Sequence, residues 1–387
     1  MIDDKQYVVD GAKIGYIVNA RLPVRYTVTE GDEFQGQDIT ESIVPIEITD
    51  LINIALEFTH GSLALEVDEY DERYLKPAFE QLATEVDTRG LRRMAIATSE
   101  FVGVPNVPPG SSGTLPGSAT DPYAEAVEKL DMGSVPMEHR IAMLAPKMHR
   151  YLTQGVQSLF NPVASISANY RKGQFAHDQL GFDEWYKTQT VYRHTIGALG
   201  GTPLVNGADQ SGSSLVTDGW TAAAATRLKE GDKIRIANVY AVNPLTRVST
   251  GNLKSFTVTV DAASTAGGAA TLTISPAIVG PGSPYQNVNA LPANDAAITI
   301  FGHASTYANT QTLLNLGYVK DAYTMVSADL PQVEGAWMCK RVRSKQLGLA
   351  FRVWKQGDIR LNTQPCRTDF LFGWKAVREE LGIVIVG

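Results

Sequence analysis

The chain has 387 residues, of which 44% are hydrophobic and 19% are charged, and its formal net charge is −7. This composition is typical of a folded protein with more than one domain and excludes an intrinsically disordered chain. The acidic balance argues against direct wrapping of nucleic acid, because phosphate binding needs clustered Lys and Arg. The sequence has no apolar run of about 18 residues and no signal-peptide pattern, which predicts synthesis in a cytoplasm and no contact with a membrane.

Residues 13–60 carry the strongest pattern in the chain. Apolar or aromatic side chains occupy even positions from Ile14 to Val28 and again, with few exceptions, from Val44 to Phe58. This alternation predicts two strands, and the polar stretch EGDEFQGQD between them predicts the tip of a long hairpin. The ribbon exceeds the roughly 5–6 residues of an ordinary strand. We therefore expect its apolar face to lie on a neighbouring copy instead of on its own chain.

A long amphipathic helix is predicted directly after the hairpin. Asp68 is placed to cap its first turn, and Pro77 predicts a kink or a restart because proline removes a helical hydrogen bond. The residues with helical spacing are Val67, Tyr70, Tyr74, Leu75, Ala78, Leu82 and Val86.

Proline, glycine and serine punctuate the next part of the chain. Residues 99–120 read as a surface loop. Asp121 and Pro122 predict the start of a helix that ends at Gly133. The stretch HRIAMLAP then predicts a short buried strand, and the sequence from Pro146 predicts another helix. Residues 161–201 have no clear pattern.

Composition changes near Leu199. The glycine-rich segment that follows, to about Gly219, reads as loop, and short strands are then predicted at KIRIANVY, LKSFTVTV, ATLTISP and AITIF. Short strands at regular spacing predict a small barrel or sandwich inserted into a different fold. The chain closes with predicted strands at LGLAFRVWK, DFLFGWKAV and LGIVIV.

A chain of this length is long enough to be an enzyme. Phosphate-binding, dinucleotide-binding, nucleophile-elbow and zinc-protease patterns do not occur. Cys339 and Cys366 lack C-x-x-C spacing and are expected to be buried free thiols. Asp232 is interpreted as a turn residue, and the histidines as surface or hydrogen-bonded side chains. We expect no catalytic site, no cofactor and no metal.

Charge is distributed unevenly. Acidic residues dominate the first 58 positions, whereas the segment from Lys340 to Arg378 is rich in bases. In a self-associating protein, such complementary ends give attraction between copies.

The order of these elements resembles the major coat protein of tailed double-stranded DNA phages, with the Hong Kong 97-type capsid fold. More closely, it resembles podophage coat proteins that carry an inserted β-barrel domain. The segments that carry the resemblance are GAKIG with RLPVRYTV, QDITESIVPIEI, DEYDERYLKPAFEQLATEVD, LFNPVASISANYRKGQ, GDKIRIANVYAVNP with TLTISPAIV, and FRVWKQGDIRLNTQPCRTDFLFGWKAVREELG.

The resemblance implies an α+β fold with six parts. They are a short N-terminal arm (1–12), an extended hairpin (13–60), a peripheral domain with a spine helix and loop (61–120), an axial domain (121–212), an inserted β-barrel domain (213–303) and a return to the axial and peripheral domains (304–387). It also implies a self-assembling icosahedral head shell of hexameric and pentameric capsomers. Scaffolding, portal and decoration proteins are the implied partners, with packaged DNA nearby but not bound by sequence.

The hairpin tip is expected to contact a neighbouring subunit. Residues 30–38 contain no lysine, so a covalent cross-link is not expected there. We predict ion pairs between acidic residues of the tip and a basic segment of the neighbour: Glu30, Asp32, Glu33, Asp38 and Glu41 with Lys340, Arg341, Arg343 and Lys345. Exposed ion pairs contribute about 0.2–1 kcal/mol each. Such pairs would therefore set the register between neighbouring subunits.

Two other functions fit parts of the sequence less well. The β-rich stretch could be a ligand-binding or carbohydrate-binding module on a carrier domain, but it has no aromatic platform. A hydrolase that uses Cys339 or Cys366 is the weakest alternative, because a nucleophilic thiol needs a histidine partner.

Overall fold

The structure is a computed structural model that describes residues 17–26, 36, 43–59, 76–109, 120–155, 180–303, 305–343, 350–358, 360 and 363–387. The chain divides into two compact units. The first comprises Met1–Val24, Asp38–Gly90 and Thr324–Val377, and the second comprises Arg25–Gln37, Leu91–Tyr323 and Arg378–Gly387.

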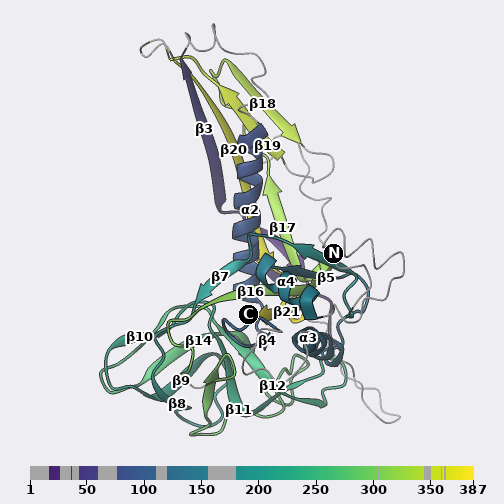
Figure 1. The fold of residues 1–387 in the computed structure, drawn as a ribbon, viewed down its shortest axis with the longest axis vertical. Coiled ribbons are helices and arrows are strands. Elements are labelled where there is room, and N and C mark those ends of the chain that lie inside the picture. The colour runs from purple at the N-terminus through teal and green to yellow at the C-terminus, as the bar shows by residue number, and fades with distance from the viewer. Residues whose placement is uncertain are drawn as a thin grey trace. The chain divides into compact units, whose positions relative to one another are not determined.

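The first unit is built on an antiparallel sheet of five strands. The order is β17-β20-β19-β18, and β3 pairs with β20 from Asp50↔Phe372 to Thr59↔Thr363. Figure 1 shows β3, β20, β19 and β18 as long neighbouring strands. The strands are β3 (Asp50–Thr59), β17 (Tyr323–Ala328), β18 (Met338–Arg343), β19 (Ala350–Lys355) and β20 (Thr363–Ala376).

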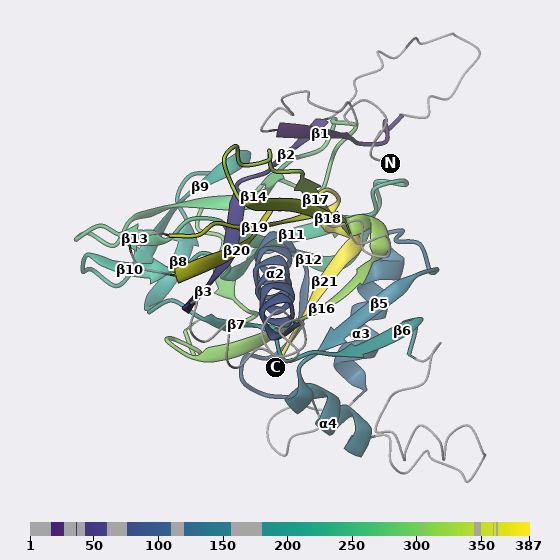
Figure 2. The same ribbon diagram turned by 90° about the horizontal axis from the view of Figure 1, so that it is seen from above.

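Helix α2 (Lys76–Ala97) covers one face of this sheet (Figure 2). Leu82 and Val86 of the helix form a buried cluster with Ile52, Phe370 and Phe372 of the strands. Burial of each large apolar side chain contributes about 1.5–3 kcal/mol, so this face stabilises the first unit.

Pro77 lies in the described part of α2, which begins at Lys76. The residues before Lys76 lie outside the described residues, so the kink or restart predicted at Pro77 stays a prediction. The helix continues to Ala97, beyond the predicted pattern that ended at Val86. The predicted positions from Val67 to Leu75 lie outside the described residues.

The described part of the predicted hairpin is paired differently from the prediction. β1 (Ile17–Arg21) pairs with β2 (Ile43–Glu47), but the continuation of the return strand, β3, pairs with β20 instead. Two long strands paired along residues 13–60 were therefore wrongly predicted. Alternation revealed which side chains share a face but did not reveal which strand is the partner.

The apolar face of the hairpin is covered by its own chain. Val18 and Ile48 form a buried cluster with Ala328, against which Val326 and Leu371 also pack. The burial of even positions confirms the predicted face, with Val18, Ala20 and Ile46 buried. The expectation that this face must lie on a neighbouring copy is wrong for the described strands.

Gly373 permits the close approach of β2 to β20. A Cβ atom at this position would lie 2.1 Å from the carbonyl oxygen of Glu47. We expect Gly373→Ala to lower the free energy of unfolding by about 1–3 kcal/mol, since the backbones must separate. Urea unfolding of the purified chain would measure this. Gly357→Ala is the matched control, because nothing lies within 4 Å of its added Cβ; equal midpoints for the two variants would contradict the contact.

The second unit contains a mixed sheet flanked by helices. Its order is β4-β21-β16-β5-β6, and β7 also pairs with β16. The strands are β4 (Phe101–Gly103), β5 (Arg140–Leu144), β6 (Glu184–Lys187), β7 (Tyr192–Thr195), β16 (Gln311–Val319) and β21 (Gly382–Val386).

Several predictions for this unit are confirmed. Helix α3 (Asp121–Met132) starts and ends as predicted, strand β5 coincides with HRIAMLAP, and helix α4 (Pro146–Gly155) begins at its proline. The predicted loop at 99–120 is wrong in one part, because β4 pairs in parallel with β21 there. Phe101 and Val102 are buried in that pairing, so they act as core residues within a polar segment.

The second unit also contains a six-stranded antiparallel sheet in the order β15-β11-β12-β14-β9-β8, with a separate β10-β13 pair. The predicted strands at KIRIANVY, LKSFTVTV, ATLTISP and AITIF are confirmed as β11, β12, β14 and β15. The loop predicted near residues 199–219 is wrong, because β8 and β9 lie there. The strands are β8 (Gly201–Val205), β9 (Gly212–Trp220), β10 (Ala225–Leu228), β11 (Lys233–Val242), β12 (Ser249–Val258), β13 (Ala262–Ser264), β14 (Ala270–Ile278) and β15 (Ile298–Ile300).

Candidate functional site

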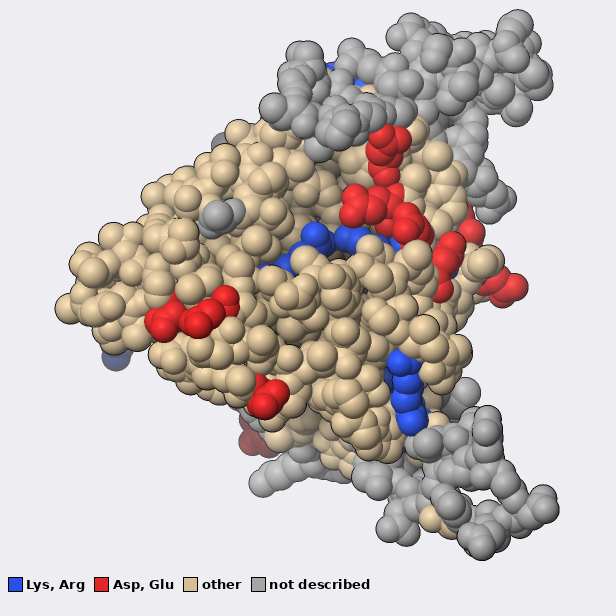
Figure 3. Space-filling model, turned by 90° about the horizontal axis from the view of Figure 1, so that it is seen from below, with Lys and Arg blue, Asp and Glu red and all other residues tan. Residues whose placement is uncertain are grey.

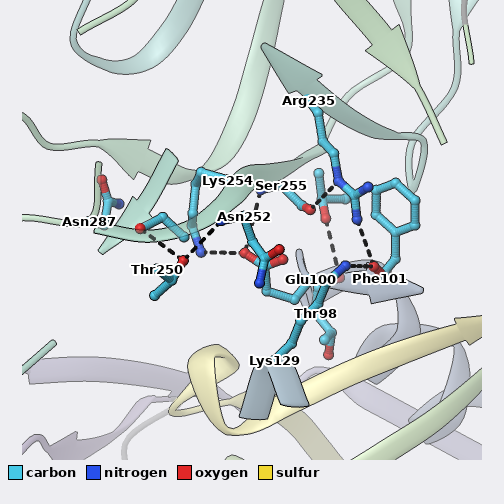
Figure 4. Close-up of polar contacts among 12 residues, drawn as sticks. Thr98, Glu100, Phe101, Lys129, Arg235, Thr250, Asn252, Lys254, Ser255 and Asn287 are labelled. Atoms are coloured by element: carbon cyan, nitrogen blue, oxygen red, sulfur yellow. Dashed lines mark hydrogen bonds and ion pairs between the residues drawn. The ribbon is translucent and has the colours of Figure 1, made fainter. Parts of the chain in front are cut away.

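Strand β11 places two basic side chains against the chain segment that follows α2. Lys233 and Arg235 alternate with Ile234 and Ile236, which are fully buried. Because neighbouring residues of a strand point to opposite faces, both cations project to one side. Figure 4 shows part of the resulting polar seam, which we define as the contacts of β11 and β12 with residues 95–101.

Arg235 binds the seam through both its charge and its flat guanidinium. The guanidinium carbon lies 3.9 Å from the centroid of the Phe101 ring, a cation–π distance. Its Nη2 donates to the carbonyl oxygen of Phe101 at 2.8 Å, and its Nε donates to Ser255 Oγ at 3.0 Å. Arg235 and Ser255 are register partners in β11 and β12, so the sheet itself presents this pair.

Lys254 and Glu100 form a second contact of the seam (Figure 4). Lys254 Nζ lies 2.9 Å from Glu100 Oε1. Burial by itself raises the pKa of Glu100, but the charges of Lys254 and Lys129 outweigh it and leave the pKa lowered. Burial lowers the pKa of Lys254, while Glu100 raises it with the larger combined effect. Both shifts favour the charged forms, so the ion pair persists at neutral pH.

Lys233 is the most deeply enclosed cation of the seam. Its side chain is fully buried, and Nζ donates to the carbonyl oxygens of Ala95 at 2.8 Å and Ile96 at 3.1 Å. Further bonds reach the carbonyl oxygen of Thr98 at 2.5 Å and Thr257 Oγ1 at 2.8 Å. The last carbonyls of a helix have no helical partner and attract cations. Lys233 therefore caps the C-terminal end of α2 from β11.

A buried His–Asp pair lies next to Lys233 in sequence. His194 Nε2 and Asp232 Oδ1 are 2.7 Å apart, and both side chains are buried. Asp232 Oδ2 accepts from the backbone amides of Lys229 at 2.8 Å and Gly197 at 3.1 Å. The bond from Lys229 confirms Asp232 as a turn residue, and His194 is hydrogen-bonded as predicted.

The seam joins residues 95–101 to strands that are more than 100 positions away in the chain. Its polar atoms are occupied by backbone carbonyls, amides and each other, as the preceding distances show. Within the described residues, no group of three or more His, Cys, Asp or Glu side chains could hold a metal ion. No helix in the described part of the chain is long and apolar enough to cross a membrane.

The predicted basic segment lies on β18, an edge strand of the sheet in the first unit. Lys340 and Arg341 are exposed there, and Arg341 Nε donates to the carbonyl oxygen of Leu330 at 2.9 Å. Arg343 ends the strand, whereas Lys345 lies outside the described residues. All five predicted acidic partners also lie outside them: Glu30, Asp32, Glu33, Asp38 and Glu41. Their pairing with the basic segment stays a prediction.

The seam was missed in the sequence, although a signal was present. In KIRIANVY, Lys233 and Arg235 alternate with isoleucines in a predicted strand. A charged side chain that a strand buries needs a polar partner, so this alternation was a signal for internal cation sites. What the sequence did not indicate was their partners, which are backbone carbonyls of residues 95–101 and the hydroxyls of Ser255 and Thr257.

The β-rich part of the second unit has little net charge. Between Gly201 and His303 the sequence carries six basic and six acidic residues. The face in Figure 3 is accordingly dominated by uncharged surface, with basic side chains in a hollow and acidic side chains beside it.

Comparisons with known proteins bear on this architecture. A family model described as P22 coat protein, gene protein 5, matches residues 29–387. The chain is similar to a solved structure from Mycobacterium phage Che8, with 11% identity and a TM-score of 0.45, over 96% of this chain and 85% of that chain. It is also similar to the capsid of the Cyanophage P-SCSP1u, with 12% identity and a TM-score of 0.46, over 96% and 83% of the two chains.

A shorter similarity involves the CUS-3 coat protein I-domain. It has 27% identity and a TM-score of 0.21, and it covers 27% of this chain and 99% of that chain. No curated protein matches the sequence.

The family match extends over most of the chain, including both units and the polar seam. The family assignment rests on the length of the match to the family model and not on the structural similarities, which are low. The chain belongs to the P22 coat protein family and is a major capsid protein that forms the head shell of a bacteriophage, so its place is in the virion.

Proposed function

We propose that the chain is a shell subunit with the Hong Kong 97-like fold, into which a β domain of residues 213–303 is inserted. The sheet of the first unit, covered by the long helix α2, supports the peripheral part of this fold. The strands from β9 to β15 support the inserted domain. The polar seam then has a role, because it ties β11 and β12 of that domain to the end of the spine helix.

Copies of this subunit associate in hexameric and pentameric capsomers through complementary charge. The acidic segment of residues 30–41 in one copy is proposed to pair with the basic segment of residues 340–345 in its neighbour. The observation that carries this proposal is the exposure of Lys340 and Arg341 on an edge strand. Edge strands that carry exposed cations resist non-specific sheet pairing, so charge selects the partner.

The remaining partners follow from the role of a head shell. A scaffolding protein directs assembly, a portal occupies one vertex, and decoration proteins bind the outer surface. Packaged DNA lies inside without sequence-specific contact, since a chain of net charge −7 does not attract phosphate. The subunit acts without catalysis, a cofactor or a metal.

Assembly of the purified chain tests this function. Mixed with the scaffolding protein of its phage, the chain is expected to form closed particles, seen by sedimentation and negative-stain electron microscopy. Reversal of Glu30, Asp32 and Glu33 to lysine should leave a folded monomer that assembles poorly. A wild-type chain that stays monomeric with its scaffolding protein would refute the proposal.

A further inference from the structure

Arg25 and Tyr26 lie early in the connection between β1 and β2, and contacts within the second unit hold both of them. Arg25 Nη2 lies 2.7 Å from Glu380 Oε1. The guanidinium carbon of Arg25 lies 5.8 Å from the centroid of the Tyr285 ring. Arg247 Nη2 donates to the carbonyl oxygen of Tyr26 at 3.4 Å. We call these three contacts the anchor.

Arg247 is presented by a closed turn between β11 and β12. Asn243 Oδ1 accepts from the backbone amides of Leu245 at 2.9 Å and Thr246 at 3.1 Å. The backbone amide of Arg247 donates to the carbonyl oxygen of Asn243 at 2.8 Å. Asn243 Nδ2 donates to Ser134 Oγ at 2.7 Å, which ties the turn to the segment after α3. An asparagine that bonds to the backbone two residues on stabilises a turn, so the backbone that carries Arg247 is fixed.

Tyr285 belongs to the connection between β14 and β15, which is fixed in a similar way. Asn287 Nδ2 donates to the carbonyl oxygen of Ala277 at 2.7 Å, and Asn287 Oδ1 accepts from the backbone amide of Val279 at 2.9 Å. The Tyr285 side chain is half-buried. Its ring lies within the range of about 6 Å over which an aromatic face attracts a cation such as Arg25.

Glu380 supplies the third contact of the anchor from a 3₁₀ turn near the end of the chain. Its Oε1 accepts from Arg378 Nη2 at 3.2 Å as well as from Arg25. The neighbouring Glu379 accepts from Ser275 Oγ of β14 at 3.3 Å. All three contacts of the anchor therefore come from segments that are themselves bonded within the second unit.

The anchor is too exposed to contribute much to folding. The side chains of Arg25 and Glu380 are 26% and 38% exposed. Water and salt weaken an ion pair of this kind, so its effect on the free energy of unfolding is small. Such contacts do restrict where a segment can go before it binds, and this lowers the entropy that binding has to remove.

The anchor shortens the free chain in front of the acidic segment of residues 30–41. Glu30 follows Tyr26 by four residues, so it lies at most about 14 Å from the anchored residue. Without the anchor, the last paired residue is Arg21 of β1, nine residues before Glu30. The reach of Glu30 then grows to about 32 Å. The volume open to Glu30 rises roughly tenfold, and its local concentration at a binding surface falls by the same factor.

We propose that Arg247, Tyr285 and Glu380 are positioning residues for shell assembly. They hold residues 25–26 of their own chain and so confine the start of the acidic segment. Two of the three belong to the inserted β domain, which gives that domain a part in assembly through its own subunit. The proposal rests on the proposed function, in which the acidic segment pairs with a neighbouring copy.

Loss of the anchor should weaken assembly and leave folding intact. Arg25→Glu places two carboxylates together and should raise the protein concentration needed for shell assembly with the scaffolding protein roughly tenfold. Its midpoint of urea unfolding should equal that of the wild type. Tyr285→Leu keeps an apolar side chain but removes the ring, so it should act in the same direction. Unchanged assembly of both variants would overturn the proposal.

Arg378→Gln is the matched control. Arg378 bonds to the same oxygen of Glu380 as Arg25 does, but within the described residues its side chain makes no bond to residues 25–26. This variant should assemble like the wild type. An unfolding midpoint that falls together with assembly in Arg25→Glu and Tyr285→Leu would show a purely structural role and overturn the proposal.

A charge exchange tests whether the anchor acts within one subunit. Glu380→Arg should assemble as poorly as Arg25→Glu, whereas a chain with both changes should recover assembly because the ion pair is restored with exchanged signs. An equimolar mixture of the two single variants should not recover it. Recovery by the mixture would show that Arg25 pairs with Glu380 of a second copy and would overturn the proposal.

The behaviour of the wild type separates this inference from the shell function. Shells formed by the wild type and equally well by Arg25→Glu would remove the anchor alone. Failure of the wild-type chain to form shells would instead refute the proposed function itself.

Discussion

Lys233→Met should lower the free energy of unfolding of the purified chain by about 2–4 kcal/mol, because it leaves buried helix-end carbonyls without a donor. Methionine has a similar length, so the change removes the charge and its donors with little change in volume. The carbonyl oxygens affected are those of Ala95, Ile96 and Thr98, and Thr257 Oγ1 loses its donor as well. Thermal or urea unfolding measures the loss.

The control for this result is Lys320→Met, which removes an exposed lysine from the same unit. Exposed substitutions change stability by about 0.5 kcal/mol or less. Equal stability of the two variants would show that Lys233 does not cap α2.

The same lysine gives the seam a pH dependence. Burial lowers the pKa of Lys233 from 10.5 to about 7, although the charges of Glu379 and Asp232 raise it in part. Between these values the unfolded chain binds more protons than the folded chain, so stability rises with pH. The stability difference between wild type and Lys233→Met should therefore grow from about pH 7 towards pH 10 and stay constant below pH 7. A flat difference across the alkaline range would contradict the shift.

Asp369→Ala should destabilise the first unit by about 3–5 kcal/mol, the cost of removing one partner from a buried ion pair. The change leaves Arg352 and Arg367 close together without their shared carboxylate. Trp354 Nε1 also loses its acceptor. Glu57→Ala is the matched control on the same face, because Glu57 is exposed on β3. Urea unfolding that fails to separate the two variants would refute this role.

Acid should weaken the wild type more than Asp369→Asn. Burial raises the pKa of Asp369, but hydrogen bonds from Arg352, Arg367 and Trp354 outweigh it and hold the pKa below its ordinary value of 3.8. A carboxyl group with a lowered pKa stabilises the folded state above its ordinary pKa, and this contribution is lost as the pH falls through the lowered value. The difference in free energy of unfolding between the wild type and Asp369→Asn should be constant above pH 4 and shrink below it.

The hairpin shows what alternation can and cannot predict. The buried even positions Val18, Ile46 and Ile52 were predicted correctly, because period two fixes the face of a strand. The pairing partner of β3 was not predicted, because β20 lies about 300 residues away in the chain and no local feature of the sequence specifies such a pairing. The apolar face of the β1–β2 hairpin likewise packs against β17, a strand that lies far along the chain.

The other differences between the predictions and the structure involve strands rich in glycine and buried basic side chains. β8 and β9 were read as loop because GTPLV and GSSLVTDGW contain the small residues that also dominate turns. Nothing in the sequence identified the carbonyl partners of Lys233, which belong to Ala95, Ile96 and Thr98. Lys340 and Arg341 were correctly grouped as basic, but only the register assigns them to opposite faces of the sheet.

Cryo-electron microscopy of particles assembled from the wild-type chain tests the account most directly. The predicted map is a closed icosahedral shell in which residues 30–41 of one subunit lie against the basic segment of residues 340–345 in its neighbour. A closed shell in which these two segments do not meet would contradict the proposed pairing, and preparations that contain only monomers would contradict the whole account.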